Sequence, residues 1–387
     1  MNYYIIPKNN LKLELFLLKT PEETHPILSY SLIYYLNEIY TNLLKLEETD
    51  NITIEYINKI VNPFEFIHTN VPGTLLSVSK VKAESIFFEL FEIFQICNLF
   101  NLSSSKSKMN IAHLTHNYAS TSYLLNLLRE DMEDIIYLDD FNFYDLCDKF
   151  VANEFPIKID FFIFEFKNYD FTNTKQYINN ILLTLFIITK YQNNNGTSII
   201  KLDGIFYKII IDVIFIFSSI YEKVFLTKPS ISNITNGERY IICKNINYNA
   251  INNSNLLSQL ESQLKPYLLD VCHCAVKPQE PNNTVLNLVS DTNAKYNLHS
   301  LLKNEIPCFF LNKIEESNVI IGQQQLESFD QIINIFKNKN KTDKIETLKR
   351  NNIQKCVQWC EKYQIPHNKF MDKINIFLSS KKKDFIE

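Results

Sequence analysis

The sequence predicts an α/β fold, in which a mostly parallel sheet with an antiparallel edge hairpin carries helical extensions at both ends. Three observations predict it. Apolar residues make up 46% of the 387 positions, which is enough for a large core. Between residues 109 and 244, short apolar strands alternate with longer apolar helices. The residues on either side of that stretch show mainly helical periodicity.

Residues 1–80 are expected to form a mainly helical N-terminal extension. Within it, residues 26–48 place leucine and isoleucine at helical spacing and predict a long amphipathic helix. The tripeptide Val71-Pro72-Gly73 marks a turn. After that turn, residues 82–100 predict a helix that is apolar on nearly all sides and is therefore buried.

Residues 81–248 are expected to form the central domain. Its last two predicted strands are joined by a loop without a helix, which favours an antiparallel hairpin. The predicted strands are 110–114, 134–138, 159–166, 197–202, 223–227 and 239–244, and the predicted helices are 120–129, 174–191 and 206–221.

Residues 249–387 predict a helical C-terminal extension with a basic tail. The range 322–363 is expected to form two helices with a basic link. Residues 336–387 carry a net charge of +7, which leaves −11 for the other 335 residues. Such a cluster can hold an RNA phosphate backbone, and a solvated helix face with a lysine-rich tail is the alternative. The candidate RNA-binding lysines here are Lys337, Lys339, Lys341 and Lys344.

Glycine is scarce, and no two of the five glycines lie within six residues of each other. Phosphate loops and dinucleotide fingerprints need several closely spaced glycines, so both are excluded. The eight cysteines form no paired CxxC set, which favours reduced thiols over a zinc site. We expect no bound metal and no membrane partner, and the absence of a signal-like N-terminus favours a cytoplasmic location.

Residues 196–244 carry the most specific pattern in the chain. Gly196 precedes a strand that contains Lys201, and a long apolar helix follows. The next strand ends in Lys228-Pro229 before a loop with two serines, and Asn236-Gly237-Glu238 precedes the final strand. This order resembles the FtsJ-like ribose 2′-O-methyltransferases, especially the mRNA cap-modifying members of large DNA viruses. The stretch IETLKRNNIQKCVQWCEKYQIP looks like the tail of those viral members.

The resemblance implies a Rossmann-like methyltransferase sheet, S-adenosylmethionine as cofactor and a Lys-Asp-Lys-Glu catalytic set. Lys201 matches the second lysine of that set and Glu238 its glutamate. Glu165 stands at the aspartate position and Glu89 at the first lysine position, so both positions are degenerate. A lysine beside the ribose hydroxyl would assist its deprotonation. The alternative is a strand-end lysine and a loop glutamate that face solvent.

The same resemblance identifies a cofactor loop over residues 110–121, where this sequence has neither glycine nor proline. Tyr118 and Ala119 occupy the family's two glycine positions. The candidate cofactor-binding residues are His116, Asn117, Tyr118, Asp139 and Asp140, and the further RNA-binding candidates are Lys228 and Ser232. For the histidines of this loop, packing or surface exposure is the favoured alternative.

Three functional hypotheses follow. The favoured one is a non-catalytic FtsJ-like protein that binds RNA or serves as a structural subunit, because the cofactor glycines are missing. The second is an active S-adenosylmethionine-dependent cap 2′-O-methyltransferase with a divergent pocket. The third is an unrelated structural α/β protein. The resemblance implies capped mRNA and other capping or virion proteins as partners, and the host cytoplasm or the virion as location.

Overall fold

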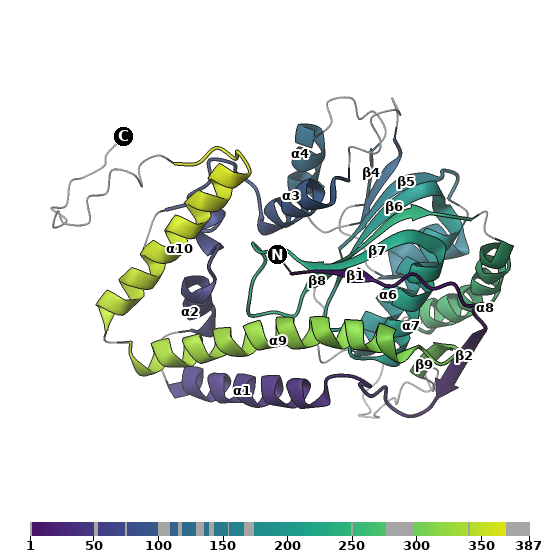
Figure 1. The fold of residues 1–387 in the computed structure, drawn as a ribbon, viewed down its shortest axis with the longest axis horizontal. Coiled ribbons are helices and arrows are strands. Elements are labelled where there is room, and N and C mark those ends of the chain that lie inside the picture. The colour runs from purple at the N-terminus through teal and green to yellow at the C-terminus, as the bar shows by residue number, and fades with distance from the viewer. Residues whose placement is uncertain are drawn as a thin grey trace, which may run out of the picture.

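The computed structural model describes residues 2–49, 53–73, 76–99, 109–114, 118–128, 135–138, 143–153, 155–165, 174–248, 251–275, 297–339 and 341–368. Figure 1 shows a twisted sheet with helices on both sides, and long helices that extend beyond the sheet.

The main sheet has seven strands in the order β1-β7-β8-β6-β5-β3-β4. Its strands are β1 (Asn2–Ile6), β3 (Ile111–Leu114), β4 (Ile135–Leu138), β5 (Ile159–Phe164), β6 (Gln192–Leu202), β7 (Tyr221–Lys228) and β8 (Arg239–Ile246). β3 pairs in parallel with β4 and β5, and β5 pairs in parallel with β6. β8 runs antiparallel to both β6 and β7. The mostly parallel, Rossmann-like α/β sheet predicted from the sequence is therefore confirmed.

The expected edge hairpin is present, but the edge itself is formed by another strand. β8 lies between β6 and β7, and β1 pairs antiparallel with the outer side of β7. Tyr4 and Ile6 of β1 are buried, whereas Tyr3 and Ile5 are 41% and 59% exposed. This alternation is that of a strand with one face on the core. The first residues of the N-terminal extension thus belong to the sheet, which the sequence did not predict, while its longer elements are helices.

A second, two-stranded sheet joins the N-terminal segment to a segment near residue 300. β2 (Leu15–Thr20) pairs antiparallel with β9 (Asn297–Leu302). These strands were not predicted, because each is recognised as a strand only by its pairing with a partner far away in the chain.

Alternate residues of β5 enter two different cores. Phe162 and Phe164 pack with α6 (Thr174–Tyr191) and α7 (Lys208–Ile220), and α8 (Ile251–Ala275) covers α6. Phe161 and Ile163 pack with α3 (Ser85–Cys97) on the opposite face, beside α4 (Tyr118–Leu128). A sheet covered on both faces explains why its strands are almost continuously apolar.

The remaining helices tie the two termini to this body. α1 (Tyr30–Thr49) lies alongside α9 (Cys308–Lys337), as Figure 1 shows. Trp359 of α10 (Thr342–Lys362) packs against the ring of Phe88 on α3. The two large cores draw on residues from all three expected domains. The other elements are α2 (Ile54–Val61), η1 (Glu65–Ile67), α5 (Phe143–Cys147) and η2 (Asp148–Ala152).

The helix boundaries lie within a few residues of those predicted, and the helix expected at residues 174–191 has those bounds in α6. The largest difference is α9, which begins at Cys308 directly after Pro307, well before the predicted start at residue 322. Among the helices of the described ranges, none combines the length and the apolar character needed to cross a membrane.

Candidate functional site

One buried amine is surrounded by three carboxylates at the carboxyl edge of the sheet. Lys201 Nζ lies 3.2 Å from Glu238 Oε2, 3.4 Å from Glu165 Oε1 and 4.0 Å from Glu89 Oε2. The Lys201 side chain is only 12% exposed. The structure therefore brings together the four positions that the sequence resemblance implied as a catalytic set.

The topology explains this convergence. Lys201 is near the end of β6, and Glu165 directly follows the parallel neighbour β5, so both reach the same sheet edge. β8 is antiparallel to β6, so Glu238, which directly precedes β8, lies at that edge too. The backbone of Glu165 is held there, because its N–H donates to the Leu114 carbonyl at 2.9 Å.

Glu89 reaches the cluster from α3 and is held by a tyrosine. The Tyr240 hydroxyl donates a 2.6 Å hydrogen bond to Glu89 Oε2. Burial raises the pKa of Glu89, and the nearby charge of Lys201 opposes that effect. Burial also raises the pKa of Tyr240 well above its ordinary value, so the phenol stays protonated and donates. Sequence reasoning did not identify Tyr240, although its place two residues after Glu238 in a predicted strand was a usable signal.

The protonation of Lys201 is set by two opposing effects. Burial lowers the pKa of its amine, whereas the charges of Glu89, Glu238 and Glu165 raise it. The carboxylates prevail, and the pKa of Lys201 lies above its ordinary value. The amine is therefore a stable ammonium ion at neutral pH.

The loop after β7 is fastened to α3 and to itself. The Glu92 carboxylate accepts hydrogen bonds from Ser230 Oγ at 2.6 Å and from the Ile231 N–H at 3.3 Å. Lys228 is 3% exposed, and its amine donates to the carbonyl and side-chain oxygens of Asn236 and to the Glu238 carbonyl. Burial lowers the pKa of Lys228 to about 8.

The loop geometry corrects two expectations about RNA contacts. Lys228 is buried, and its three hydrogen bonds within the loop use all the donors of an ammonium group. Ser232 is 1% exposed and donates to the Pro229 carbonyl at 2.8 Å. Both side chains shape the loop that carries Glu238 and do not face a ligand on the surface.

A second buried layer, which the sequence did not reveal, lies behind Glu238. Arg239 is 1% exposed and donates to the Gly237 carbonyl at 3.0 Å and to Asn318 Oδ1 of α9 at 2.8 Å. Asp203 accepts the Gly204 N–H at 2.8 Å. Burial, together with the charge of Glu238, raises the pKa of Asp203 to about 6. The Arg239 side chain connects this layer to helix α9.

The proposed cofactor residues are only partly within the described structure. His116, Asn117, Asp139 and Asp140 lie outside the described residues, and Tyr118 is described only as the first residue of α4. The adjoining His113 is fully buried in β3, and neither ring nitrogen has a hydrogen-bond partner among the described residues. Burial lowers the pKa of His113 to about 3, which keeps the ring neutral.

The described part of this segment is connected to the region before α3. Only three residues, without glycine, connect β3 to α4. The hydroxyl of Ser120 accepts the Glu84 N–H at 3.1 Å, and the neighbouring Thr121 is fully buried. The start of α4 is thus fastened to the segment before α3.

The lysine cluster of the sequence lies at a different place. Lys337, Lys339, Lys341 and Lys344 are exposed around the junction of α9 and α10. Figure 1 shows this junction well away from the sheet. The cluster is therefore a separate surface and not a wall of the Lys201 site.

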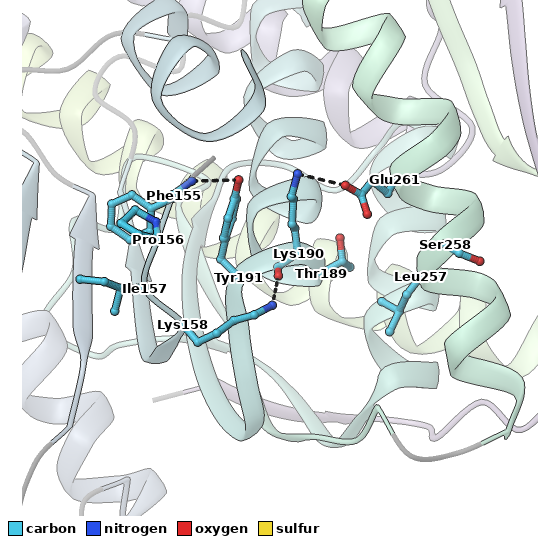
Figure 2. Close-up of a pocket in the computed structure, with 10 residues that line it drawn as sticks. All are labelled: Phe155, Pro156, Ile157, Lys158, Thr189, Lys190, Tyr191, Leu257, Ser258 and Glu261. Carbon is cyan, nitrogen blue, oxygen red and sulfur yellow. Dashed lines mark hydrogen bonds and ion pairs between the residues drawn. The ribbon is translucent and has the colours of Figure 1, made fainter. Parts of the chain in front are cut away.

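A pocket of about 460 Å³ lies at the opposite edge of the sheet, before the amino end of β5 (Figure 2). Lys158 donates to the Lys190 carbonyl at the end of α6, and the Lys190 amine pairs with Glu261 of α8 at 3.0 Å. These lysines are used to cap and connect helices. Among the described residues, no cluster of metal-ligating side chains is present.

No family model matches the sequence, and no curated protein matches it. The structure is similar to a ribosomal RNA methyltransferase from Plasmodium falciparum, with a TM-score of 0.27 and 16% identity over 40% of this chain and 95% of that chain. It is similar to a protein described as a hemolysin from Streptococcus thermophilus, with a TM-score of 0.30 and 13% identity over 51% and 82% of the two chains. A protein described as a spermidine synthase from Corynebacterium glutamicum gives a TM-score of 0.30 and 10% identity over 57% and 89%.

Proposed function

We propose that the chain is an FtsJ-like protein of the ribose 2′-O-methyltransferase type that has lost catalysis and acts as an RNA-binding or structural subunit. One observation carries the proposal. The Lys201 amine lies within 4.0 Å of three carboxylates. Its partners in this role, by the resemblance, are capped mRNA and an active capping or virion protein.

The arrangement is unsuited to removing a proton from a ribose hydroxyl. A general base must exchange its proton near the working pH, and the pKa of a hydroxyl lies far above 7. Burial lowers the pKa of Lys201, but the three carboxylates raise it above the ordinary lysine value, so the amine retains its proton. At the position where the family has a second lysine, Glu89 adds a negative charge to the site.

The charge of the site also disfavours RNA at this edge. The carboxylates that surround Lys201 repel phosphates at short range. The exposed lysines at the junction of α9 and α10 supply the opposite charge on a separate surface. We therefore assign RNA binding to Lys337, Lys339, Lys341 and Lys344.

Calorimetric titration with S-adenosylmethionine tests the loss of catalysis. We expect no binding heat at millimolar ligand, because the described start of α4 is packed and the connecting segment has no glycine. A measurable affinity would contradict the non-catalytic form of the proposal.

Fluorescence anisotropy with a labelled single-stranded RNA tests the RNA-binding role. We expect an affinity that falls steeply with salt, because each neutralised phosphate releases counterions. Replacing Lys337, Lys339 and Lys341 together by glutamine should weaken binding and reduce the salt slope by about 3. Lys303→Gln, a change at a 74% exposed lysine outside the cluster, is the matched control and should have no effect. Unchanged RNA binding in the triple variant would leave only a structural role.

An active cap methyltransferase is the second candidate. The observation that favours it is the convergence of Glu89, Glu165, Lys201 and Glu238 at one sheet edge. Transfer of a labelled methyl group from S-adenosylmethionine to a capped RNA, lost in Lys201→Met, would support this candidate and reject the first.

A further inference from the structure

A pocket of about 460 Å³ opens between the last turns of α9 and the first turns of α10. Its floor is aliphatic and consists of the half-buried side chains of Ile335, Ile345 and Leu348. Its polar lining consists of three carboxamides and one amine, which belong to Gln331, Asn334, Asn338 and Lys344. No carboxylate is among these described lining residues. An apolar floor with a few convergent polar groups is the usual composition of a ligand site.

The polar groups of this pocket are not used by the fold. Gln331 and Asn334 are exposed, and their carboxamides have no hydrogen-bond partner within the described ranges. Asn338 donates from Nδ2 to the Asn334 carbonyl at 2.9 Å, so its Oδ1 remains an acceptor. The pocket therefore offers hydrogen-bond donors and acceptors side by side above an aliphatic surface.

The lysines at the pocket are not paired with carboxylates among the described residues. Lys337, Lys341 and Lys344 are exposed and have no ion-pair partner within the part of the chain that the structure describes. On the same two helices, Lys313 is paired with Glu316 at 2.7 Å and Lys349 with Glu346 at 3.2 Å. The charges of Lys337, Lys341 and Lys344 are thus available to a ligand of the pocket.

We propose that this pocket binds one unstacked base of single-stranded RNA, with adenine preferred, while Lys337, Lys341 and Lys344 contact the adjoining phosphates. The proposal rests on the proposed RNA-binding function and gives it a base-reading subsite. Carboxamides of Asn and Gln pair bidentately with the N6 and N7 edge of adenine. The aliphatic floor covers one face of the base, and lysines bind the backbone irrespective of sequence.

The chemistry favours this occupant over the other polymers that a basic surface attracts. The carboxylates of an acidic peptide accept hydrogen bonds only, whereas the edge of adenine offers the N6 donor and the N7 acceptor that one carboxamide pairs with. A base within a duplex is stacked on both faces and cannot enter a pocket between two helices. The base of a single strand can, and the sequence-specific recognition of RNA uses such unstacked bases.

The test compares two labelled ten-residue RNA oligomers on the full chain by fluorescence anisotropy. One is oligoadenylate, and the other has the same phosphates but carries no bases. We expect oligoadenylate to bind about tenfold more tightly, with the same salt slope for both oligomers. The double change Gln331→Ala and Asn334→Ala should reduce its affinity to that of the abasic oligomer. Gln323→Ala, at an exposed position on α9 outside the pocket, is the matched control and should change nothing.

The possible failures are distinguishable. Equal, salt-dependent affinity for the two oligomers would overturn the base pocket and leave the RNA-binding function standing. The same conclusion follows if Gln323→Ala abolishes the preference as fully as the double variant does. No salt-dependent binding of either oligomer would overturn the RNA-binding function, and the pocket with it. A urea unfolding curve of the double variant that matches the parent excludes misfolding as the cause of a lost preference.

Discussion

The Tyr240 hydroxyl donates a 2.6 Å hydrogen bond to Glu89 Oε2, and the two residues are 151 positions apart in the chain. The bond joins β8 to α3 and holds the Glu89 carboxylate 4.0 Å from the Lys201 amine. Glu89 is thereby fixed where the resembled family has a lysine. The carboxylate at this position has a donor, because the tyrosine hydroxyl points to it.

The first prediction concerns this bond. Tyr240→Phe should lower the free energy of unfolding by about 1.5–3 kcal/mol, because a buried carboxylate loses a donor. In a Glu89→Leu background the same change should cost less, and urea unfolding of the four proteins measures the difference as a coupling energy. Tyr123→Phe, at a tyrosine that is 48% exposed, is the control and should change the free energy by less than about 0.5 kcal/mol. A coupling energy near zero would show that the bond contributes nothing.

The second prediction concerns the amine shared by three carboxylates. Lys201→Met leaves Glu89, Glu165 and Glu238 without their shared partner, and it should cost about 3–5 kcal/mol at pH 7.5. The loss should become smaller toward pH 5, because burial raises the pKa of Glu89 and this carboxyl takes up a proton as the pH falls. Unfolding in urea at both pH values measures it.

The control for this change is a surface ion pair. Lys223 lies 3.9 Å from Glu222, and both side chains are more than half exposed. Lys223→Met should therefore cost less than about 1 kcal/mol at either pH. If Lys201→Met costs no more than this control, the carboxylates do not depend on the amine for charge compensation.

The order of the central elements could be predicted from the sequence, because apolar strands and helices differ in period and in length. The helix of α6 and the strands β5, β6 and β8 follow directly from such runs. β1 could not be predicted, since its five residues are recognised as a strand only once β7 is present beside them. The first half of α9 was not predicted either, because it mixes exposed apolar and polar residues.

The site was predictable only in part, and for a physical reason. Lys201 and Glu238 stand in a motif with recognisable spacing, and Glu89 and Glu165 were found by alignment to that motif. The strand register decides which face of the sheet each side chain takes. Without it, the sequence could not assign Tyr240, Asp203 and Arg239 to the site. Lys228 was expected to contact RNA, but it is buried. A lysine at the end of a strand looks the same in the sequence whether it faces solvent or a loop.

The third prediction concerns pH. Burial and the charge of Glu238 raise the pKa of Asp203 from 3.8 to about 6, so the folded protein holds this proton more tightly than the unfolded chain. The stability from this protonation is present at low pH and is lost as the pH rises from about 4 to about 6. Asp203→Asn imitates the protonated form and removes this pH dependence. Relative to the parent, the variant should gain about 3 kcal/mol between pH 4 and pH 7.

Urea unfolding of the parent and of Asp203→Asn at intervals across this range measures the difference. Asp343→Asn, on the exposed side of α10, serves as the control and should change it by less than about 0.5 kcal/mol. A constant difference between the parent and Asp203→Asn at all pH values would show that Asp203 has an ordinary pKa.

The last prediction concerns the loop that carries Glu238. Glu92 is 1% exposed and accepts from both Ser230 Oγ and the Ile231 N–H. Glu92→Leu fills the same space and removes both acceptors, so the Ile231 amide should exchange with deuterium about tenfold faster by NMR. Ser230→Ala removes one bond only and leaves the Ile231 amide paired, so its protection should persist. The Lys201 amide is the control: it belongs to the central strand β6, so its exchange rate should be the same in both variants. Equal protection of the Ile231 amide in both variants would show that Glu92 does not anchor the loop.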